Sequence, residues 1–202
     1  MTAQPKQIMS AAEYLAFERA QQDKHEFYEG EVYLQAGASV AHNLITANLI
    51  ALLRPQLRGG PCRVYPSDIR IKIPQRSHYL YADVSIICGP ILFDDADPET
   101  VRNPKIIIEV LSPSTESYDR GRKFQAYRRI PDFDEYLLIA QDTIRVEHFV
   151  RQSATMWTMT EYTQLAAIIQ LSSIDMRVPM ASLYEDLELG EEGELDGYDD
   201  HL

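Results

Sequence analysis

The sequence contains few cysteines and no long hydrophobic run. Its two cysteines, Cys62 and Cys88, are too few for a disulfide framework and lack the paired spacing of a zinc site. We therefore expect both to be small buried hydrophobic residues in a reducing cytosol. No apolar stretch approaches the roughly 20 residues of a membrane-spanning helix, and residues 1–10 lack the apolar segment of a secretory signal. These absences predict a cytoplasmic protein with no membrane partner.

The length and composition are typical of a globular chain with one core. The chain has 202 residues, of which 45% are hydrophobic and 25% are charged. A chain of this size can bury a substantial core within one domain, which we expect to span residues 1–189. Residues 190–202 are acidic and poor in core residues, so a disordered tail is expected there.

The negative charge is concentrated at the C-terminal end. The net charge of −12 at first argues against a nucleic-acid partner. However, residues 185–202 hold nine acids and no Lys or Arg, whereas the rest of the chain carries 22 acids and 19 bases, a net charge of −3. The body of the protein is therefore not strongly repulsive to a polyanion, although no basic DNA-binding surface is indicated either.

Hydrophobic periodicity and turn residues predict the order of helices and strands. Helices are expected over residues 11–20, 40–57 and 119–130. Strands are expected over residues 63–73, 79–88, 105–111, 135–140, 143–151, 155–162 and 167–171, after a hairpin of residues 25–28 and 32–34 around Glu29-Gly30. The acid-rich stretch 89–104 is expected to be a solvated loop. This order predicts an α+β fold with an α/β core, in which helices flank a mixed sheet between an N-terminal hairpin and C-terminal meander strands.

Two acids interrupt segments that are otherwise typical of buried strands. Glu109 lies within the apolar run from Ile106 to Leu111, and Asp83 lies within the similar segment 80–87. A carboxylate in such a strand must be paired, protonated or bound to a metal, because an isolated buried charge costs many kcal/mol. Two acids inside two core strands therefore suggest a functional site.

The helix after the second of these strands carries a lysine on its buried face. Helical spacing places Asp119, Lys123, Ala126, Tyr127 and Ile130 on one side of residues 119–130. A pair of carboxylates binds Mg²⁺ through oxygen, and the cation lowers the pKa of a bound water and offsets charge on a phosphoryl oxygen. A neighbouring lysine would orient that water or stabilise the negative charge of the transition state.

Each of these residues also has a simpler interpretation. Asp83 or Glu109 alone is consistent with a hydrogen-bonded structural carboxylate, and Lys123 alone with a surface lysine whose stem lies along apolar side chains. The order of acid, acid and lysine along successive elements is a stronger indication than any one of the three.

Three motifs carry a resemblance to a known family. They are Tyr81-Ala82-Asp83-Val84, the run Ile107-Ile108-Glu109-Val110-Leu111-Ser112-Pro113-Ser114-Thr115, and Asp119-x-x-x-Lys123-x-x-x-Tyr127. Together with the hairpin Glu26-Phe27-Tyr28-Glu29-Gly30 and with His42, they resemble the bacterial Uma-type endonuclease family over about residues 8–185. That family is placed in the PD-(D/E)XK, or restriction-endonuclease-like, superfamily.

The resemblance implies a metal-dependent endonuclease acting on DNA, with Mg²⁺ as cofactor and Mn²⁺ as a substitute. Asp83 and Glu109 would be metal ligands, the main-chain carbonyl of Val110 a third ligand, and Lys123 the catalytic lysine. Leu111 stands where the superfamily pattern has a lysine. Catalysis therefore requires Lys123 to reach the site from the following helix.

Four further residues are secondary candidates: Glu26, His42, Asp119 and Tyr127. Glu26 would add a carboxylate to the metal site or be an exposed hairpin residue, and His42 would contact the site or be a buried structural histidine. A homodimer is expected if both strands of a duplex are cut. The alternative function is a catalytically inactive binding or assembly module that keeps the nuclease fold.

Overall fold

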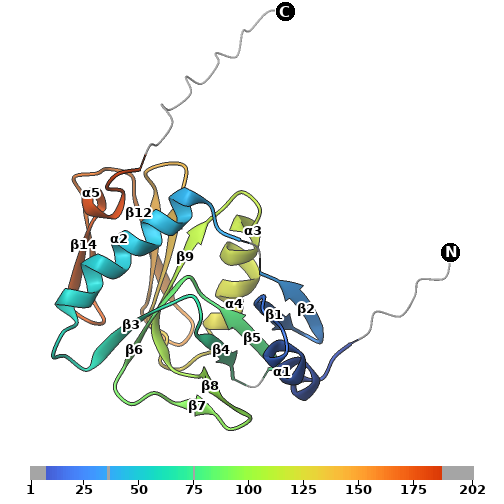
Figure 1. The fold of residues 1–202 in the computed structure, drawn as a ribbon. Coiled ribbons are helices and arrows are strands. Elements are labelled where there is room, and N and C mark those ends of the chain that lie inside the picture. Colours follow the sequence, from blue (N-terminus) through green and yellow to red (C-terminus); the bar gives the residue numbers. More distant parts are fainter. Residues whose placement is uncertain (1–7, 36, 75, 188–202) are drawn as a thin grey trace, which may run out of the picture.

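The structure is a computed structural model that describes residues 8–35, 37–74 and 76–187, which fold into two six-stranded sheets, a small hairpin and a few helices (Figure 1). The first sheet has the order β2-β1-β5-β4-β8-β7, with β1 at His25–Tyr28, β2 at Glu31–Leu34, β4 at Arg70–Ile73, β5 at His78–Tyr81, β7 at Phe93–Asp94 and β8 at Asp97–Val101. The predicted tail at 190–202 lies outside the described residues.

The second sheet is the centre of the molecule. Its order is β12-β11-β10-β9-β6-β3, with β3 at Cys62–Pro66, β6 at Val84–Cys88, β9 at Pro104–Leu111, β10 at Glu135–Ala140, β11 at Val146–Arg151 and β12 at Trp157–Tyr162. The hairpin pairs β13, Ile168–Leu171, with β14, Met176–Pro179. The predicted mixed α+β architecture is confirmed.

Helices α2, at Val40–Gln56, and α4, at Phe124–Tyr127, cover opposite faces of the second sheet (Figure 1). Helix α1, at Ala11–Arg19, packs against β1 and β5 of the first sheet. The other helical elements are α3 at Glu116–Tyr118, the π-helical turn η1 at Asp119–Lys123 and α5 at Met180–Leu183. Within the described residues, no helix is both long enough and apolar enough to span a membrane.

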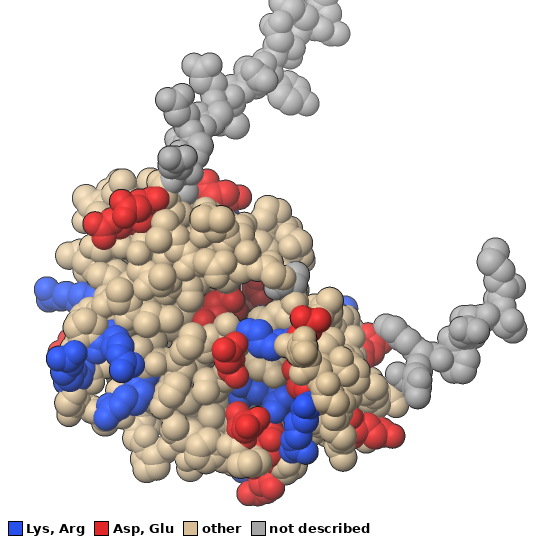
Figure 2. Space-filling model, in the orientation of Figure 1, with Lys and Arg blue, Asp and Glu red and all other residues tan. Residues whose placement is uncertain are grey.

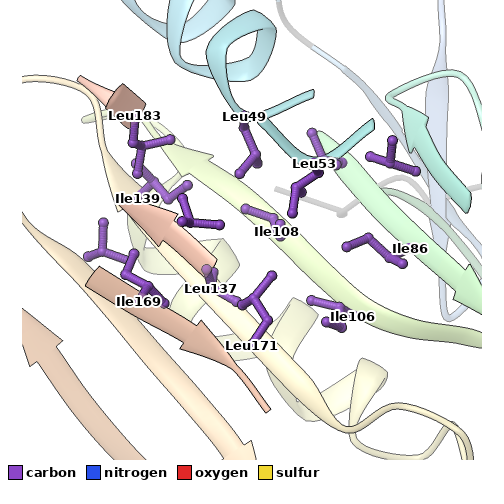
Figure 3. Packing of buried hydrophobic residues seen from close by; sticks show 14 of the residues in the cluster. Leu49, Leu53, Ile86, Ile106, Ile108, Leu137, Ile139, Ile169, Leu171 and Leu183 are labelled. Atoms are coloured by element: carbon purple, nitrogen blue, oxygen red, sulfur yellow. The ribbon is translucent and has the colours of Figure 1, made fainter. Parts of the chain in front are cut away.

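The core on one face of the sheet is formed by α2. Leu49 and Leu53 are completely buried and pack with Ile86, Ile106 and Ile108 of the strands beneath them (Figure 3). Burying one such side chain stabilises the fold by roughly 1.5–3 kcal/mol. The predicted helix 40–57 is confirmed, and Pro55, which cannot donate a backbone hydrogen bond, lies in its last turn, so only one bond close to the end of the helix is lost.

Strand β9 divides its side chains between the two faces. Ile108 and Val110 belong to the core under α2, whereas Ile107 and Leu111 belong to the core that contains Tyr127 of α4. Because successive side chains of a strand point to opposite faces, Glu109 lies on the α4 side. The alternation within β9 therefore directs its carboxylate toward the element that carries the candidate lysine.

The predicted strands 63–73 and 79–88 are each broken into two. The chain leaves the first sheet after β5 and enters the second sheet at β6, and Ala82 and Asp83 form the crossing. The prediction that Asp83 lies inside a core strand was therefore wrong. A residue at such a crossing has no place in either ladder, so its side chain is available to neighbouring elements.

The predicted helix 119–130 contains a π-helical turn, and its helical segment begins at Glu116 and ends at Tyr127, earlier than expected at both ends. The amide of Phe124, which caps η1, donates to the carbonyl of Asp119, and α4 ends at Tyr127. Such turns are rare and are often found at functional sites. Asp119, Lys123 and Tyr127 are all buried, as the predicted helical face required.

The stretch 89–104 is not the solvated loop that its acids predicted. It forms the pair β7 and β8, in which Asp94 and Asp97 are buried. Arg70 donates to Asp97 at 2.6 Å, and Lys72 donates to Asp94 at 2.7 Å. Both cations come from β4, so the acids are neutralised by a strand that lies some 25 residues earlier in the sequence.

Cys62 and Cys88 form a disulfide, which contradicts the prediction of two free buried cysteines. The two residues occupy directly opposite positions in the antiparallel pair of β3 and β6. This register, which the spacing of the cysteines in the sequence does not reveal, brings the two sulfur atoms together.

We expect Asp97→Asn to lower the free energy of unfolding by about 3 kcal/mol near pH 7, because it leaves the buried Arg70 without its charge partner. Burial opposes the ionisation of Asp97, but hydrogen bonds from Thr100, Arg19 and Arg70 outweigh it and lower its pKa. The contribution of the Asp97 carboxylate to the free energy of unfolding is therefore complete above the ordinary aspartate pKa of about 3.9. It is lost as the pH falls through the lower pKa of Asp97 in the folded state.

Urea unfolding of wild type and Asp97→Asn at pH 7 and at pH 3 provides the measurement. The difference between the two proteins should shrink at the lower pH. Asp68→Asn is the control, since Asp68 is 83% exposed in its ion pair with Lys24 and such pairs contribute less than about 1 kcal/mol. An Asp97→Asn deficit that is the same at both pH values contradicts the assignment.

We expect loss of the disulfide to destabilise the oxidised protein by about 2–4 kcal/mol, since the bond closes a loop with a sequence separation of 26. Cys62→Ser and Cys88→Ser should each unfold at lower urea than wild type, and added reductant should remove the difference. Intact mass after alkylation is the second measurement. Two alkylated cysteines in the folded, unreduced protein would contradict the pairing.

Candidate active site

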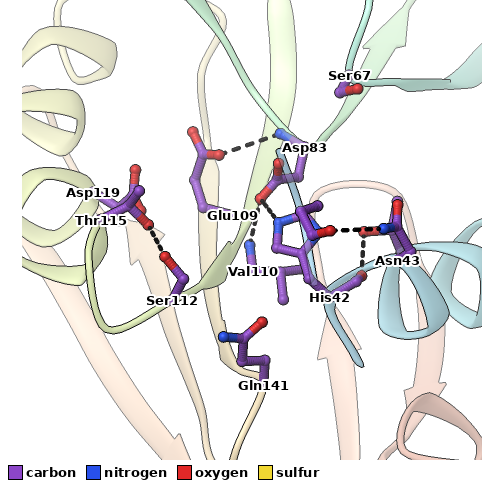
Figure 4. A network of polar contacts seen from close by, with 12 residues as sticks. His42, Asn43, Ser67, Asp83, Glu109, Val110, Ser112, Thr115, Asp119 and Gln141 are labelled. Carbon is purple, nitrogen blue, oxygen red and sulfur yellow. Dashed lines mark hydrogen bonds and ion pairs between the residues drawn. The ribbon is translucent and has the colours of Figure 1, made fainter. Parts of the chain in front are cut away.

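The crossing between the two sheets places Asp83 against Glu109. The amide of Asp83 donates to Glu109 Oε2 at 3.2 Å, and the amide of Val110 donates to Asp83 Oδ2 at 2.7 Å (Figure 4). The two predicted acids are therefore neighbours, although 25 residues separate them in the sequence. The pairing of Val84 with Ile108 in β6 and β9 fixes this juxtaposition.

Lys123, in η1, lies on the side of the second sheet where Glu109 points. Its ammonium lies 3.2 Å from Glu109 Oε1 and 3.4 Å from Asp119 Oδ1, and it donates to the carbonyl of Tyr81 at 2.9 Å. Only 6% of the residue is exposed. The alternative of a surface lysine is therefore wrong, and the structure brings Lys123 together with Glu109.

Glu26 joins this cluster from strand β1. Its Oε1 atom lies 3.2 Å from the Lys123 ammonium and accepts a hydrogen bond from the amide of Tyr81 at 3.1 Å. Glu26 is 5% exposed, so the alternative of an exposed hairpin residue is wrong. Tyr127 completes the cluster, because its hydroxyl donates to Glu109 Oε1 at 3.1 Å.

His42 contacts the other acid from the first turn of α2. Ser39 caps this helix by accepting a hydrogen bond from the His42 amide at 3.1 Å. The ring atom His42 Nε2 then lies 3.0 Å from Asp83 Oδ2 (Figure 4). The histidine is thus neither a solvent-exposed residue nor an isolated core residue, and it lies beside a candidate metal ligand.

The carboxyl groups differ in their tendency to ionise. Burial raises the pKa of Glu109 well above its ordinary value, and repulsion from Asp83 adds to this against the attraction of Lys123. Burial raises the pKa of Asp119 in the same way, again opposed by Lys123. Burial also acts on Asp83, but its hydrogen bond and attraction to His42 outweigh it and lower the pKa of Asp83.

The lysine is held in its charged form. Burial alone would lower its pKa, but the carboxylates of Glu109, Glu26 and Asp119 outweigh burial and raise the pKa of Lys123 well above its ordinary value. Three carboxyl groups, those of Glu26, Glu109 and Asp119, lie within 3.4 Å of this one ammonium group. A cation bound beside them would favour their ionised forms.

The donor atoms fit a hard cation such as Mg²⁺. Asp83 and Glu109 offer carboxylate oxygens and Val110 offers a main-chain carbonyl oxygen, and Mg²⁺ commonly binds one or two carboxylates while it retains several waters. No group of three or more His, Cys, Asp or Glu side chains in the described part of the chain is arranged to hold a metal ion. The set of two carboxylates and one carbonyl that the resemblance implies stays a prediction.

These residues lie at the floor of a cavity of about 950 Å³. Its walls come from the β1–β2 hairpin, the start of α2 and the segment 112–119. In the space-filling view, acidic and basic side chains are mixed around the hollow in the middle of the molecule (Figure 2). A phosphodiester that entered the cavity would therefore approach Asp83 and Glu109.

Sequence reasoning missed Gln141, which also lines the cavity. It follows β10, and its Oε1 atom accepts a hydrogen bond from the Ser39 hydroxyl at 2.6 Å. The parallel pairing of β10 with β9, up to Ala140 opposite Leu111, places the residue after β10 beside the end of β9. The available signal was thus its place at the carboxyl end of a parallel strand, where ligands commonly bind.

Comparison with known proteins gives consistent results. The sequence is 34% identical to slr1290 of Synechocystis sp. over 89% of this chain and 93% of that protein, and 40% identical to sll1609 of the same organism over 82% and 93%. The fold is similar to the crystal structure of "a putative nuclease belonging to DUF820" from Anabaena variabilis. That similarity has a TM-score of 0.71 at 15% identity and covers 87% of this chain and 97% of that one.

The family comparison accounts for nearly the whole described chain. Residues 11–180 match the Uma2 family, which is described as "Putative restriction endonuclease". This match spans every element from α1 to the end of β14. On this match and on its two relatives, the protein belongs to the Uma2 family.

Proposed function

We propose that this protein is a metal-dependent endonuclease that hydrolyses DNA phosphodiester bonds, with Asp83, Glu109 and Lys123 as its catalytic residues. The observation that carries the proposal is the position of the Lys123 ammonium, 3.2 Å from Glu109, at the floor of a cavity. Membership of a family described as "Putative restriction endonuclease" supports the nuclease class.

Asp83, Glu109 and the carbonyl of Val110 are the proposed ligands of Mg²⁺, for which Mn²⁺ would substitute. The bound cation would offset charge on a phosphoryl oxygen and lower the pKa of a water molecule. The backbone of this chain already orients the ligands, since the Val110 amide holds Asp83 and the Asp83 amide holds Glu109.

Lys123 would perform the role of the lysine that is missing at position 111. Leu111 is 4% exposed and packs in the apolar core on the α4 side of the sheet. The helical segment instead carries an ammonium to the Glu109 carboxylate from outside the strand. Its positive charge would stabilise the negative charge that develops on the phosphoryl group.

Four neighbours would position these groups. Tyr127 and Glu26 fix the Glu109 carboxylate and the Lys123 ammonium through the contacts described above. Asp119 holds the lysine from one turn earlier, and His42 holds Asp83. Each would act through a catalytic residue rather than on the substrate.

One observation favours the alternative of a catalytically inactive binding module. The Lys123 ammonium is already engaged by three carboxylates and the carbonyl of Tyr81. A lysine that remained in these contacts would contribute to stability and would not reach a phosphate. Metal binding and catalysis therefore have to be measured separately.

We expect wild type to nick plasmid DNA with Mg²⁺, and we expect Asp83→Asn and Lys123→Met to reduce the rate by about 100-fold or more. Asp68→Asn and Lys105→Met are matched controls, because both residues lie outside the cavity, and they should cut like wild type. Calorimetry should show Mg²⁺ binding by wild type and its loss in Asp83→Asn.

Circular dichroism of each variant separates loss of activity from loss of fold. If wild type and both site variants cleave equally, the assignment of Asp83 and Lys123 is wrong. A folded wild-type protein that binds neither Mg²⁺ nor Mn²⁺ supports the inactive module instead.

A further inference from the structure

The catalytic groups lie too deep to meet the surface of a closed duplex. Glu109 is 1% exposed and Lys123 is 6% exposed, and the Asp83 side chain is 14% exposed. They are reached through a cavity of about 950 Å³, a volume near the upper end of the range of about 300–1,000 Å³ for small-molecule pockets. A duplex presents its phosphates on the outside of a stiff rod, whereas a separated strand can enter such a cavity.

The charges around the cavity do not form a track for a phosphate backbone. Its lining contains three cationic residues, and two of them are already paired: Lys24 lies 3.0 Å from Asp68, and Lys123 lies among the site acids. Five acids share the same lining: Asp23, Glu26, Asp83, Glu109 and Asp119. Figure 2 accordingly shows mixed red and blue side chains there and no continuous blue surface. Affinity that depends on many Lys and Arg contacts with phosphates is therefore not expected at this cavity.

Exposed apolar side chains occupy one rim of the same cavity. Leu34 is 64% exposed and Tyr33 is 37% exposed, and both line the cavity from β2, the edge strand of the first sheet. Unpaired bases stack on aromatic and apolar side chains in proteins that bind single strands. A paired base offers only its edge, because its faces are covered by its neighbours.

Amide side chains supply donors and acceptors beside this rim. Gln35, Asn43 and Gln141 line the cavity. Asn43 Nδ2 already donates to the carbonyl of Ser39 and Gln141 Oε1 accepts from the Ser39 hydroxyl, whereas Gln35 Oε1 is buried without a hydrogen-bond partner in the described structure. Asn and Gln side chains pair with the edges of bases, adenine above all. A buried acceptor without a partner is costly, and the exocyclic amino group of a base would satisfy it.

We infer that the substrate class of this site is single-stranded DNA, bound with an unpaired base against Tyr33 and Leu34 while the adjoining phosphate faces the proposed cation site of Asp83 and Glu109. This inference rests on the proposed nuclease function, which assigns Asp83 and Glu109 as the site at which the phosphodiester is cut. The rim contacts do not involve the metal ligands, so binding of the base is measurable without catalysis.

The test is binding of a single-stranded DNA oligonucleotide that contains 2-aminopurine, with EDTA present to prevent cleavage. Stacking should quench the fluorescence of the base, and Tyr33→Ala and Leu34→Ser should each raise the Kd by about tenfold. Leu92→Ser is the matched control, because Leu92 is 51% exposed and lies outside the cavity. The same oligonucleotide in a duplex should bind at least about tenfold more weakly.

Three outcomes would overturn the inference: equal affinity for duplex and single strand, an unchanged Kd in both rim variants, or tighter binding of the matched RNA strand. Cleavage of the same oligonucleotides with Mg²⁺ is then measured separately. Rim-dependent binding without any cleavage would retain the inference for the cavity and reject the proposed nuclease function. Cleavage of the duplex but not of the single strand would support the proposed nuclease function and reject the inference of a single-stranded substrate.

Discussion

The ion pair between Lys123 and Glu109 is the interaction on which the site depends. Both residues are almost completely buried, and a buried charge that loses its partner destabilises a protein by about 3–5 kcal/mol. The lysine also contacts Glu26 of β1, Asp119 of η1 and the carbonyl of Tyr81 in β5. One ammonium group thereby connects the N-terminal hairpin, both large sheets and the helical segment. The contacts of the candidate site therefore also stabilise the packing of the elements that carry it.

The same cluster would also favour the binding of a cation. Three carboxyl groups contact the lysine, and burial raises the pKa of Glu109 and of Asp119. A hard cation that bound Asp83 and Glu109 would favour their ionised forms, and the backbone amides of Asp83 and Val110 already hold both groups in place. The depth of these acids, the exposed Leu34 at the rim of the cavity and the small number of Lys and Arg residues in its lining are the features from which we infer a single-stranded substrate.

Much of the site was predictable because its residues obey the two simple periods of secondary structure. The alternation of β9 and the helical spacing from Asp119 to Tyr127 place Glu109, Lys123 and Tyr127 together. The predictions that were wrong concerned features that depend on contacts between segments distant in the sequence. Asp94 and Asp97 were expected to be solvated because their partners, Lys72 and Arg70, lie in another strand. The break at Asp83 follows from a change of sheet that the apolar pattern of the sequence does not encode.

The sequence by itself determined the mixed α+β class, the burial of β9, and the order of acid, acid and lysine that resembles the Uma-type family. Only the tertiary structure decided that Glu26 and His42 lie at the site, that Gln141 lines the cavity, and that Cys62 and Cys88 are joined. The physical reason is that local periodicity fixes which face a side chain occupies. The register and pairing of strands that are far apart in the sequence decide which residues of other elements that side chain contacts.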